Sequence, residues 1–310
     1  MMMGVWIDTD MGFDDIAAIL TVMHAGLQID GVSLCFGNTT IDQVQANAAS
    51  ASVTFDWRFP IHTGSASPVL GQLETAQSIL GSNGIPTLGA SFASAPPLRF
   101  SRAFPALCQW LESEPAGPRR ILALGPLTNI AALALARPDL AQTIDEIVWM
   151  GGGVTSGNHT ASAEFNAFAD PEALAIILAN GLPLKMIDLD LCRKVQASAD
   201  AAERVRACGG KNAELLADLL GGFIAIAVRQ GRTSMALYDP VAAIAFSYPD
   251  LVRFADARID AELSTGLTRG RTVVETRVHK AAPNAEYAVE IDGDTALSHI
   301  LEALCAEASR

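Results

Sequence analysis

The stretch Asp8-Thr9-Asp10-Met11-Gly12-Phe13-Asp14-Asp15 places four carboxylates within eight residues near the start of the chain. The apolar run 4–7 before it predicts a buried strand, and the apolar run 16–23 after it has helical spacing. The acids therefore lie where a first strand passes into a first helix, which is the edge where open α/β sheets bind ligands. Like charges this close repel unless a cation lies among them, and oxygen-rich clusters suit calcium or magnesium.

Helix capping explains only part of this cluster. Aspartate is a good N-cap and is favoured in the first turn of a helix, which accounts for Asp14 and for Asp15. Asp8 and Asp10 close a buried strand, so capping does not explain them.

Strand-like and helix-like segments alternate along the chain, which predicts a mainly parallel sheet wrapped by helices. We expect a single α/β domain over residues 1–310, with an open, mostly parallel central sheet flanked by helices. The expected strands are 5–8, 29–35, 61–62, 121–124, 147–150, 184–189, 272–278 and 287–291. The expected helices are 14–25, 41–55, 127–136, 171–180, helical stretches within 197–230, 240–246 and 295–308.

The composition excludes several classes of function. The 310 residues are 50% hydrophobic and carry a formal net charge of −13, which disfavours nucleic acid and anionic membranes as partners. No uninterrupted apolar span of membrane length and no secretory signal pattern is visible. The five cysteines are scattered without paired zinc spacing, which is typical of free thiols in a reducing compartment, so we expect a cytoplasmic protein.

The acidic octapeptide resembles the N-terminal fingerprint of the nucleoside hydrolase family, Asp-x-Asp-Pro-Gly-x-Asp-Asp, with Met11 in place of the usual proline. Other segments agree with the family in order and spacing: Gly37-Asn38, Leu124 to Asn129, Met150-Gly151-Gly152, Glu164-Phe165-Asn166 with Asp170-Pro171-Glu172, and Asp239-Pro240. The resemblance covers about residues 8–240 and implies the family's fold, an N-glycosidase activity in nucleoside salvage, and assembly as a homodimer or homotetramer.

The resemblance also implies a calcium site. Asp10 closes the strand and Asp15 opens the helix, so both can reach one ion, and Asp239 would supply a third carboxylate. Leu124 is similar in position to the family's backbone carbonyl ligand. All these ligands are oxygens, which favours calcium over zinc, while magnesium stays possible on chemical grounds.

Further residues match the family's substrate contacts. Neighbouring helix residues point about 100° apart, so Asp14 can face the sugar hydroxyls while Asp15 faces the ion. Asn38, Glu164 and Asn166 resemble the family's remaining sugar contacts, with Glu164 and Asn166 sharing one face of an extended segment. Met150, Phe165 and His159 are further expected substrate contacts, His159 because it lies in a loop rich in Gly, Ser and Thr between Met150 and Glu164. Asp170 is expected only to cap the helix that begins at Pro171.

The implied reaction is hydrolysis of the N-glycosidic bond of ribonucleosides. Asp10 would act as general base on the attacking water, and the transition state would resemble an oxocarbenium ion. The leaving-group side departs from the family, because Leu80 and Tyr238 stand where relatives can carry histidines. Tyr238 is therefore the candidate proton donor, and Arg229, Arg232 and Tyr287 are candidates for the base pocket.

Three other functions stay open at this point. The altered leaving-group side is compatible with hydrolysis of an atypical ribosyl compound, or with a catalytically silent ribose-binding protein. Asp8-Thr9-Asp10 alone also suggests a haloacid-dehalogenase-like phosphatase, although the double acid Asp14-Asp15 is foreign to that class.

Overall fold

Alternating strands and helices build the protein, which is described here by a computed structural model over residues 4–95, 98–113, 117–277 and 279–310. The strands are β1 (Gly4–Thr9), β2 (Gln28–Leu34), β3 (Ile61–Thr63), β4 (Ser101–Arg102), β5 (Arg120–Ala123), β6 (Glu146–Met150), β7 (Leu184–Ile187), β8 (Gln196–Ser198), β9 (Ser234–Ala236), β10 (Val252–Ala261), β11 (Thr272–Glu275) and β12 (Ala285–Ile291). The helices are α1 (Phe13–His24), α2 (Ile41–Thr54), α3 (Gln77–Leu80), α4 (Ala103–Glu112), α5 (Thr128–Ala136), α6 (Pro138–Ala141), α7 (Phe165–Ala169), α8 (Pro171–Ala179), α9 (Leu189–Cys192), α10 (Ala199–Ala207), α11 (Ala213–Arg229), α12 (Tyr238–Ser247) and α13 (Gly293–Ala308).

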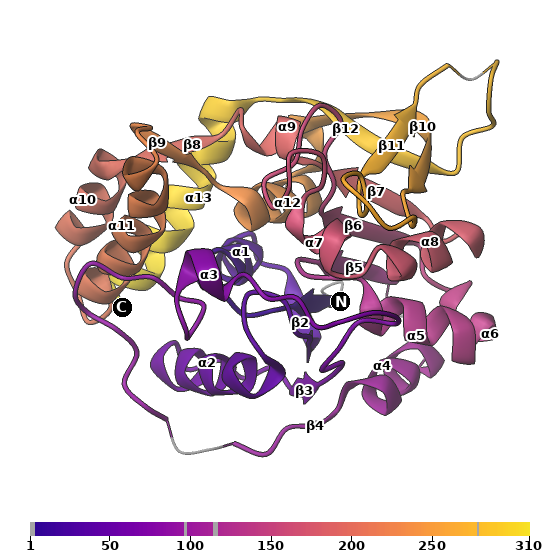
Figure 1. Cartoon of the computed structure of the whole chain (residues 1–310). Helices are drawn as coiled ribbons and strands as arrows, with labels where there is room; N and C mark the ends of the chain where they lie inside the picture. The colour runs from indigo at the N-terminus through magenta and orange to yellow at the C-terminus, as the bar shows by residue number, and fades with distance from the viewer. Residues whose placement is uncertain (1–3, 96–97, 114–116, 278) are drawn as a thin grey trace.

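A ten-stranded sheet has the order β11-β10-β12-β7-β6-β5-β1-β2-β3-β4 (Figure 1). The pairings from β4 to β12 are parallel, whereas β10 runs antiparallel to both β11 and β12. Strands β8 and β9 form a separate antiparallel pair. The central strand β1 lies between β5 and β2, so its carboxyl end is in the middle of the edge where the acids were expected.

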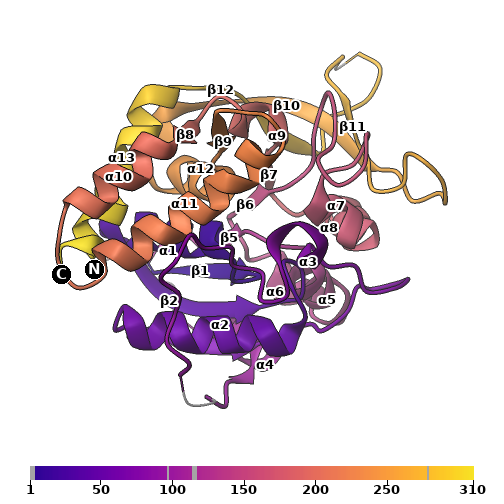
Figure 2. The ribbon, with the colours of Figure 1, turned by 60° about the vertical axis from the view of Figure 1, so that its left-hand side comes forward.

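Helices cover both faces of the sheet, and β1 shows why. Val5 and Ile7 belong to one core with residues of α1, α11, α12 and α13, whereas Trp6 belongs to a second core with residues of α4, α5 and α8. Burying each such side chain contributes about 1.5–3 kcal/mol. Figures 1 and 2 both show α10, α11 and α13 grouped on the opposite side of the molecule from α5, α6 and α8.

The predicted α/β architecture is confirmed, with corrections at several elements. The expected strand 184–189 ends at Ile187, because Asp188 caps α9 by accepting the N–H of Leu191. The stretch 197–230 begins in β8, and α10 and α11 follow, separated by the turn at residues 208–212. The expected strand 272–278 ends at Glu275, and its last residue, Val278, lies outside the described residues.

Two substantial elements were not predicted. Strand β10, with ten residues, alternates apolar and polar side chains without a break from Ala255 to Ala261, so its period-2 signal is present in the sequence and was overlooked. Helix α4 follows a loop rich in Pro and Ala, and its N-terminus carries no side-chain cap. Within the described residues, no helix is both long and apolar enough to span a membrane.

Candidate active site

The tight connection between β1 and α1 fixes the acidic motif at the carboxyl edge of the sheet. Met11 adopts a left-handed φ of 46°, and its N–H donates to the Thr9 hydroxyl at 3.1 Å. Asp15, in the first turn of α1, accepts the N–H of Gly12 at 2.8 Å and the Thr9 hydroxyl at 2.5 Å. The Asp15 carboxylate is therefore held by the turn that precedes its own helix.

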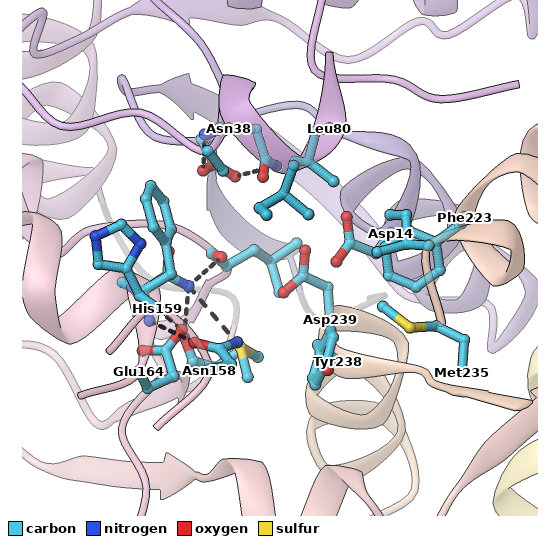
Figure 3. Close-up of a pocket in the computed structure, with 18 of the residues that line it drawn as sticks. Asp14, Asn38, Leu80, Asn158, His159, Glu164, Phe223, Met235, Tyr238 and Asp239 are labelled. Atoms are coloured by element: carbon cyan, nitrogen blue, oxygen red, sulfur yellow. Dashed lines mark hydrogen bonds between the residues drawn. The ribbon is translucent and has the colours of Figure 1, made fainter. Parts of the chain in front are cut away.

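Three carboxylates from two helices converge here. Asp14 and Asp15 of α1 and Asp239 of α12 each offer an oxygen within 4.8 Å of the others, although Asp239 lies more than 220 residues further along the chain. Helices α1 and α12 pack against each other, which brings these residues together. Figure 3 shows the carboxylates of Asp14 and Asp239 facing the middle of the pocket.

Asp10 lies beside this triad, bound by Asn38 from the loop after β2. The backbone N–H of Asn38 donates to Asp10 Oδ2 at 2.6 Å, and Asn38 Nδ2 donates to Asp10 Oδ1 at 2.9 Å and to Asp15 Oδ2 at 3.0 Å. A Cβ atom at Gly37 would lie 1.9 Å from Asp10 Oδ2, so only glycine leaves room for this carboxylate.

Burial and mutual repulsion disfavour ionisation throughout the cluster. Burial, followed by the charge of Asp15, raises the pKa of Asp14 to about 8 and the pKa of Asp10 well above its usual range. Burial also raises the pKa of Asp239, with the negative charges of Asp14, Asp15 and Asp10 adding to the effect. The pKa of Asp15 is raised by burial too, against the hydrogen bond from Thr9.

These residues fit a hard divalent cation. Every donor in the cluster is a carboxylate oxygen, and the charges acting on Asp239 from its neighbours are all negative. Positive charge among the carboxylates would reverse the repulsion that raises their pKa values. The chemistry of the donor set therefore agrees with the metal that the resemblance implies.

A second wall of the pocket is built around Glu164 and Asn166. Asn166 Nδ2 donates to the carbonyl oxygens of Leu124 and Met150, both at 2.9 Å, so it ties the ends of β5 and β6 together. Glu164 accepts the N–H groups of Gly152, at 2.9 Å, and of Ala167, at 3.0 Å. Burial raises the pKa of Glu164 to about 7 despite these bonds.

The sequence predicted an extended segment at Glu164 and Asn166, and this prediction is wrong. Glu164 is the N-cap of α7, and its carboxylate accepts the N–H groups of Asn166 and Ala167. Capping stabilises a helical turn at this position, and both side chains nevertheless line the pocket. Asp170 caps α8 through the N–H of Ala173, as predicted, and also accepts the Thr128 hydroxyl at 2.6 Å.

The remaining walls are mostly apolar and enclose a cavity of about 180 Å³. Phe223 and Met235 lie on one side of the carboxylates, with His159 and Asn158 on the other and Leu80 above (Figure 3). The His159 ring packs against Phe165 and Phe168, with centroids 5.4 and 4.5 Å away, and burial lowers its pKa. Tyr238 packs edge-on against Phe223, and burial raises its pKa above 10.

Most residues selected from the sequence line this one pocket. They are Asp10, Asp14, Asn38, Leu124, Met150, His159, Glu164, Phe165, Asn166, Tyr238 and Asp239, with Asp15 buried in contact with Asp10. The structure groups Asp14 with Asp15 and Asp239, whereas we expected Asp10 in that position; the division of roles between Asp10 and Asp14 stays a prediction. Of the three base-pocket candidates, Arg232 lines the cavity, whereas Arg229 and Tyr287 are not among its lining residues.

Sequence reasoning missed several lining residues. Phe223 and Ile226 come from one face of α11, Gln230 is the C-cap of that helix, and Met235 comes from β9. The spacing of Phe223 and Ile226 is that of an ordinary apolar helix face, so no sequence signal separates them from core positions. Asn158 was missed as well, although it lies beside His159 in a loop rich in Gly, Ser and Thr, which is a composition typical of binding loops.

Comparisons with known proteins agree with this site. A family model described as inosine-uridine preferring nucleoside hydrolase matches residues 5–298. The pyrimidine-specific ribonucleoside hydrolase RihB of Escherichia coli is 29% identical over 293 residues, which are 93% of this chain and 92% of the relative. A purine-preferring ribonucleoside hydrolase from Gardnerella vaginalis has a similar structure, with a TM-score of 0.89 and 25% identity over 99% of each chain.

A plant nucleoside hydrolase has the same fold, with a TM-score of 0.89, 23% identity, and coverage of 98% of this chain and 99% of that one. The match of the family model over nearly the whole chain is what decides membership. The chain belongs to the inosine-uridine preferring nucleoside hydrolase family, whose members are N-glycosidases.

Proposed function

We propose that this protein catalyses the calcium-dependent hydrolysis of the N-glycosidic bond of ribonucleosides, releasing the free base and ribose, with Asp10 as general base. The observation that carries this proposal is the meeting of Asp10, Asp14, Asp15 and Asp239 with the Glu164–Asn166 wall around one cavity. Relatives are named as pyrimidine-specific and as purine-preferring, so the proposal covers ribonucleosides in general.

Water attack takes place beside Asp10. A divalent cation, held by Asp15, Asp239 and the Leu124 carbonyl together with Asp10 or Asp14, would lower the pKa of a nearby water. Asp10, oriented by its two hydrogen bonds from Asn38, accepts a proton from that water. A positioned general base of this kind contributes about 10²–10⁴-fold to the rate.

The sugar is bound by the polar groups next to the acids. Asp14, Asn38, Glu164 and Asn166 are proposed to contact the ribose hydroxyls, with Met150 and Phe165 packing against the ring. As the bond to the base breaks, the sugar becomes oxocarbenium-like, and the surrounding carboxylates stabilise its positive charge. Because the contacts address vicinal hydroxyls, 2′-deoxyribonucleosides should react poorly.

Tyr238 is the proposed proton donor to the base. It lines the cavity beside Phe223, and its raised pKa keeps the hydroxyl protonated at neutral pH. His159 is the alternative donor, although its lowered pKa leaves it mostly neutral there. Cytoplasmic location and assembly as a homodimer or homotetramer stay predictions.

Ribose release from a panel of ribonucleosides, measured after chelation and again with added calcium, tests the proposal. We expect release that depends on calcium, is much slower with 2′-deoxyribonucleosides, and falls by about 10²–10⁴-fold in Asp10→Asn. Asp42→Asn, an exposed acid on α2, is the matched control. Tight ribose binding without any release would instead identify a catalytically silent ribose-binding protein.

If ribose is released only from ribosides that are not ribonucleosides, the natural substrate is an atypical ribosyl compound, and the altered leaving-group side of the site is adapted to it. A panel that includes a nitrophenyl riboside, whose leaving group needs no proton, distinguishes this case. Release from the nitrophenyl riboside alone would contradict the proposed substrate class while keeping the proposed chemistry.

A further inference from the structure

Among the described residues, one lysine or arginine side chain lines a cavity whose carboxylates are its other charged groups. Asp10, Asp14, Glu164 and Asp239 line it, and Arg232 is the one lysine or arginine among the lining residues of the described chain. Arg232 Nη2 donates to Gln230 Oε1 at 2.7 Å, and Gln230 also lines the cavity. Within the described residues no carboxylate forms an ion pair with Arg232, whereas Arg193 pairs with Asp190 at 3.0 Å.

Residues of helix α11 line the cavity between the carboxylates at one end and Arg232 at the other. Phe223 and Ile226 line the cavity from one face of α11, and Gln230, the C-cap of the helix, continues their spacing four residues further on. Phe223 lies beside Asp14 (Figure 3), and Gln230 is seven residues further on, which is about 10 Å along the axis. The ends of the cavity thus differ: carboxylates at the sugar end, and Gln230 with Arg232 at the far end.

A substrate held by its ribose at the acids extends its base toward that far end. This step rests on the proposed function, because it uses the sugar contacts assigned above. When the bond between the anomeric carbon and the base nitrogen breaks, its electron pair moves to the base, water supplies the new bond to carbon, and the proton lost by the water passes to Asp10. In a base with a ring carbonyl, the negative charge collects on the carbonyl oxygen until a proton arrives.

We propose that Arg232 stabilises the departing base by donating a hydrogen bond from its guanidinium group to a carbonyl oxygen of that base. An arginine carries its charge at every working pH and offers several N–H donors in one plane, which suits a carbonyl oxygen that is gaining charge. Relatives can carry histidines at the positions of Leu80 and Tyr238, and a protonated histidine would stabilise the negative charge on the base. Arg232 would supply that stabilisation in this protein. Gln230 fixes the guanidinium group for this contact.

The position of Tyr238 agrees with this assignment. Arg232 and Tyr238 line the same cavity, and the positive charges of Arg232 and Arg193 both lower the pKa of Tyr238 against the larger effect of burial. A hydroxyl and a guanidinium group on the wall of one cavity can address two atoms of one base, the nitrogen that leaves the sugar and a neighbouring carbonyl oxygen.

The test compares leaving groups in Arg232→Met, with Arg229→Met as the matched control. Arg229 is exposed at the end of α11 and does not line the cavity. We expect Arg232→Met to lower kcat/KM by about 10- to 100-fold for uridine and inosine, which is the range for a hydrogen bond to a charged group. Turnover of adenosine, whose base has no carbonyl oxygen, and of a nitrophenyl riboside should be nearly unchanged, as should every rate in Arg229→Met.

Arg232→Lys keeps the charge without the planar group and should recover part of the loss. Equal losses on all four substrates, no loss on uridine and inosine, or a lysine variant as slow as the methionine variant would each overturn the assignment. Unchanged melting temperatures exclude a folding effect. If the parent enzyme releases ribose from none of these substrates with calcium present, the proposed function is wrong. If the parent is active but the variants do not show the expected substrate pattern, only the role assigned to Arg232 is wrong.

Discussion

Asn38 binds both carboxylate oxygens of Asp10, one through its backbone N–H at 2.6 Å and the other through its side-chain amide at 2.9 Å. Asp10 follows β1 and Asn38 follows β2, and these strands pair in parallel. The orientation of the proposed base is therefore fixed by the pairing of two neighbouring strands. It also leaves the carboxylate little freedom to relax if its surroundings change.

Gly37→Ala should abolish most activity without unfolding the protein. The new Cβ would lie 1.9 Å from Asp10 Oδ2, so the carboxylate must turn away from Asn38. We expect kcat to fall by at least about 10²-fold, as for loss of a positioned base, and the melting temperature to fall as well, because alanine is strained at the φ of 158° that Gly37 adopts. Gly26→Ala is the control, because Gly26 has a left-handed φ of 78° and a Cβ there meets nothing within 4 Å, so alanine brings backbone strain without a clash. Normal turnover in Gly37→Ala would show that the position of Asp10 is not critical.

Asp239→Asn should weaken metal binding. Asp239 offers one of three oxygens that lie within 4.8 Å of each other, so its loss removes a charged donor from the cluster. A ligand present at 100 times its Kd stabilises a protein by about 2.7 kcal/mol, so calcium should raise the melting temperature of the parent by several degrees and that of the variant much less. Calcium titrations followed by calorimetry would measure both effects. An identical calcium response in the two proteins would remove Asp239 from the site.

Tyr238→Phe should slow natural ribonucleosides far more than a nitrophenyl riboside. The Tyr238 hydroxyl has a raised pKa, so it stays protonated and can donate to the base throughout the neutral range. The parent should then show no loss of kcat/KM between pH 6 and pH 8 that reports deprotonation of the donor. Equal losses on both kinds of substrate would indicate packing instead, and no loss on either would move the role of donor to His159 or to water.

Glu164→Gln should flatten the dependence of stability on pH. The pKa of Glu164 is about 7 in the folded protein against an ordinary value of 4.5, so its folded state favours the protonated form. The stability from this group is complete below pH 4.5 and is lost as the pH rises through 7, by roughly 3 kcal/mol for a shift of this size. Urea unfolding between pH 5 and pH 8, after chelation, should therefore show a smaller decline in the variant. Part of the decline in stability should remain in the variant, because Asp8 and Asp14 also have raised pKa values, of about 7 and about 8. A slope equal to that of the parent would contradict the shift at Glu164.

Met11→Pro, which introduces the residue usual in the family, should destabilise this protein. Met11 has a φ of 46°, whereas proline is confined to about −65°, and proline also lacks the N–H that Met11 donates to Thr9. We expect a loss of more than about 1 kcal/mol in the free energy of unfolding, measured in urea, together with lower activity. Met11→Leu, which keeps the buried volume and the N–H, should fold with less loss. A proline variant as stable as the parent would show that this turn can adopt a second conformation.

The alternating apolar and polar segments were sufficient to predict the α/β class, because parallel strands buried on both faces leave long apolar runs in the sequence. The acidic motif located the site for a similar reason: Asp10 and Asp15 flank one strand-to-helix turn, and the carboxyl edge follows from that local geometry. Local sequence therefore predicted the acidic end of the pocket and, separately, the cap that Asp170 provides for α8.

Only the tertiary structure could supply the rest. The grouping of Asp14 with Asp239 depends on how α1 packs against α12. The helical turn at Glu164 depends on the backbone N–H groups that its carboxylate accepts, and the sequence pattern does not show these hydrogen bonds. The far end of the pocket was the least predictable part, because Phe223 and Ile226 have the spacing of any buried helix face and Gln230 is an exposed polar residue after that helix. Their meeting with Arg232 and the acids results from packing between segments distant in the sequence, and such contacts leave no local pattern in it.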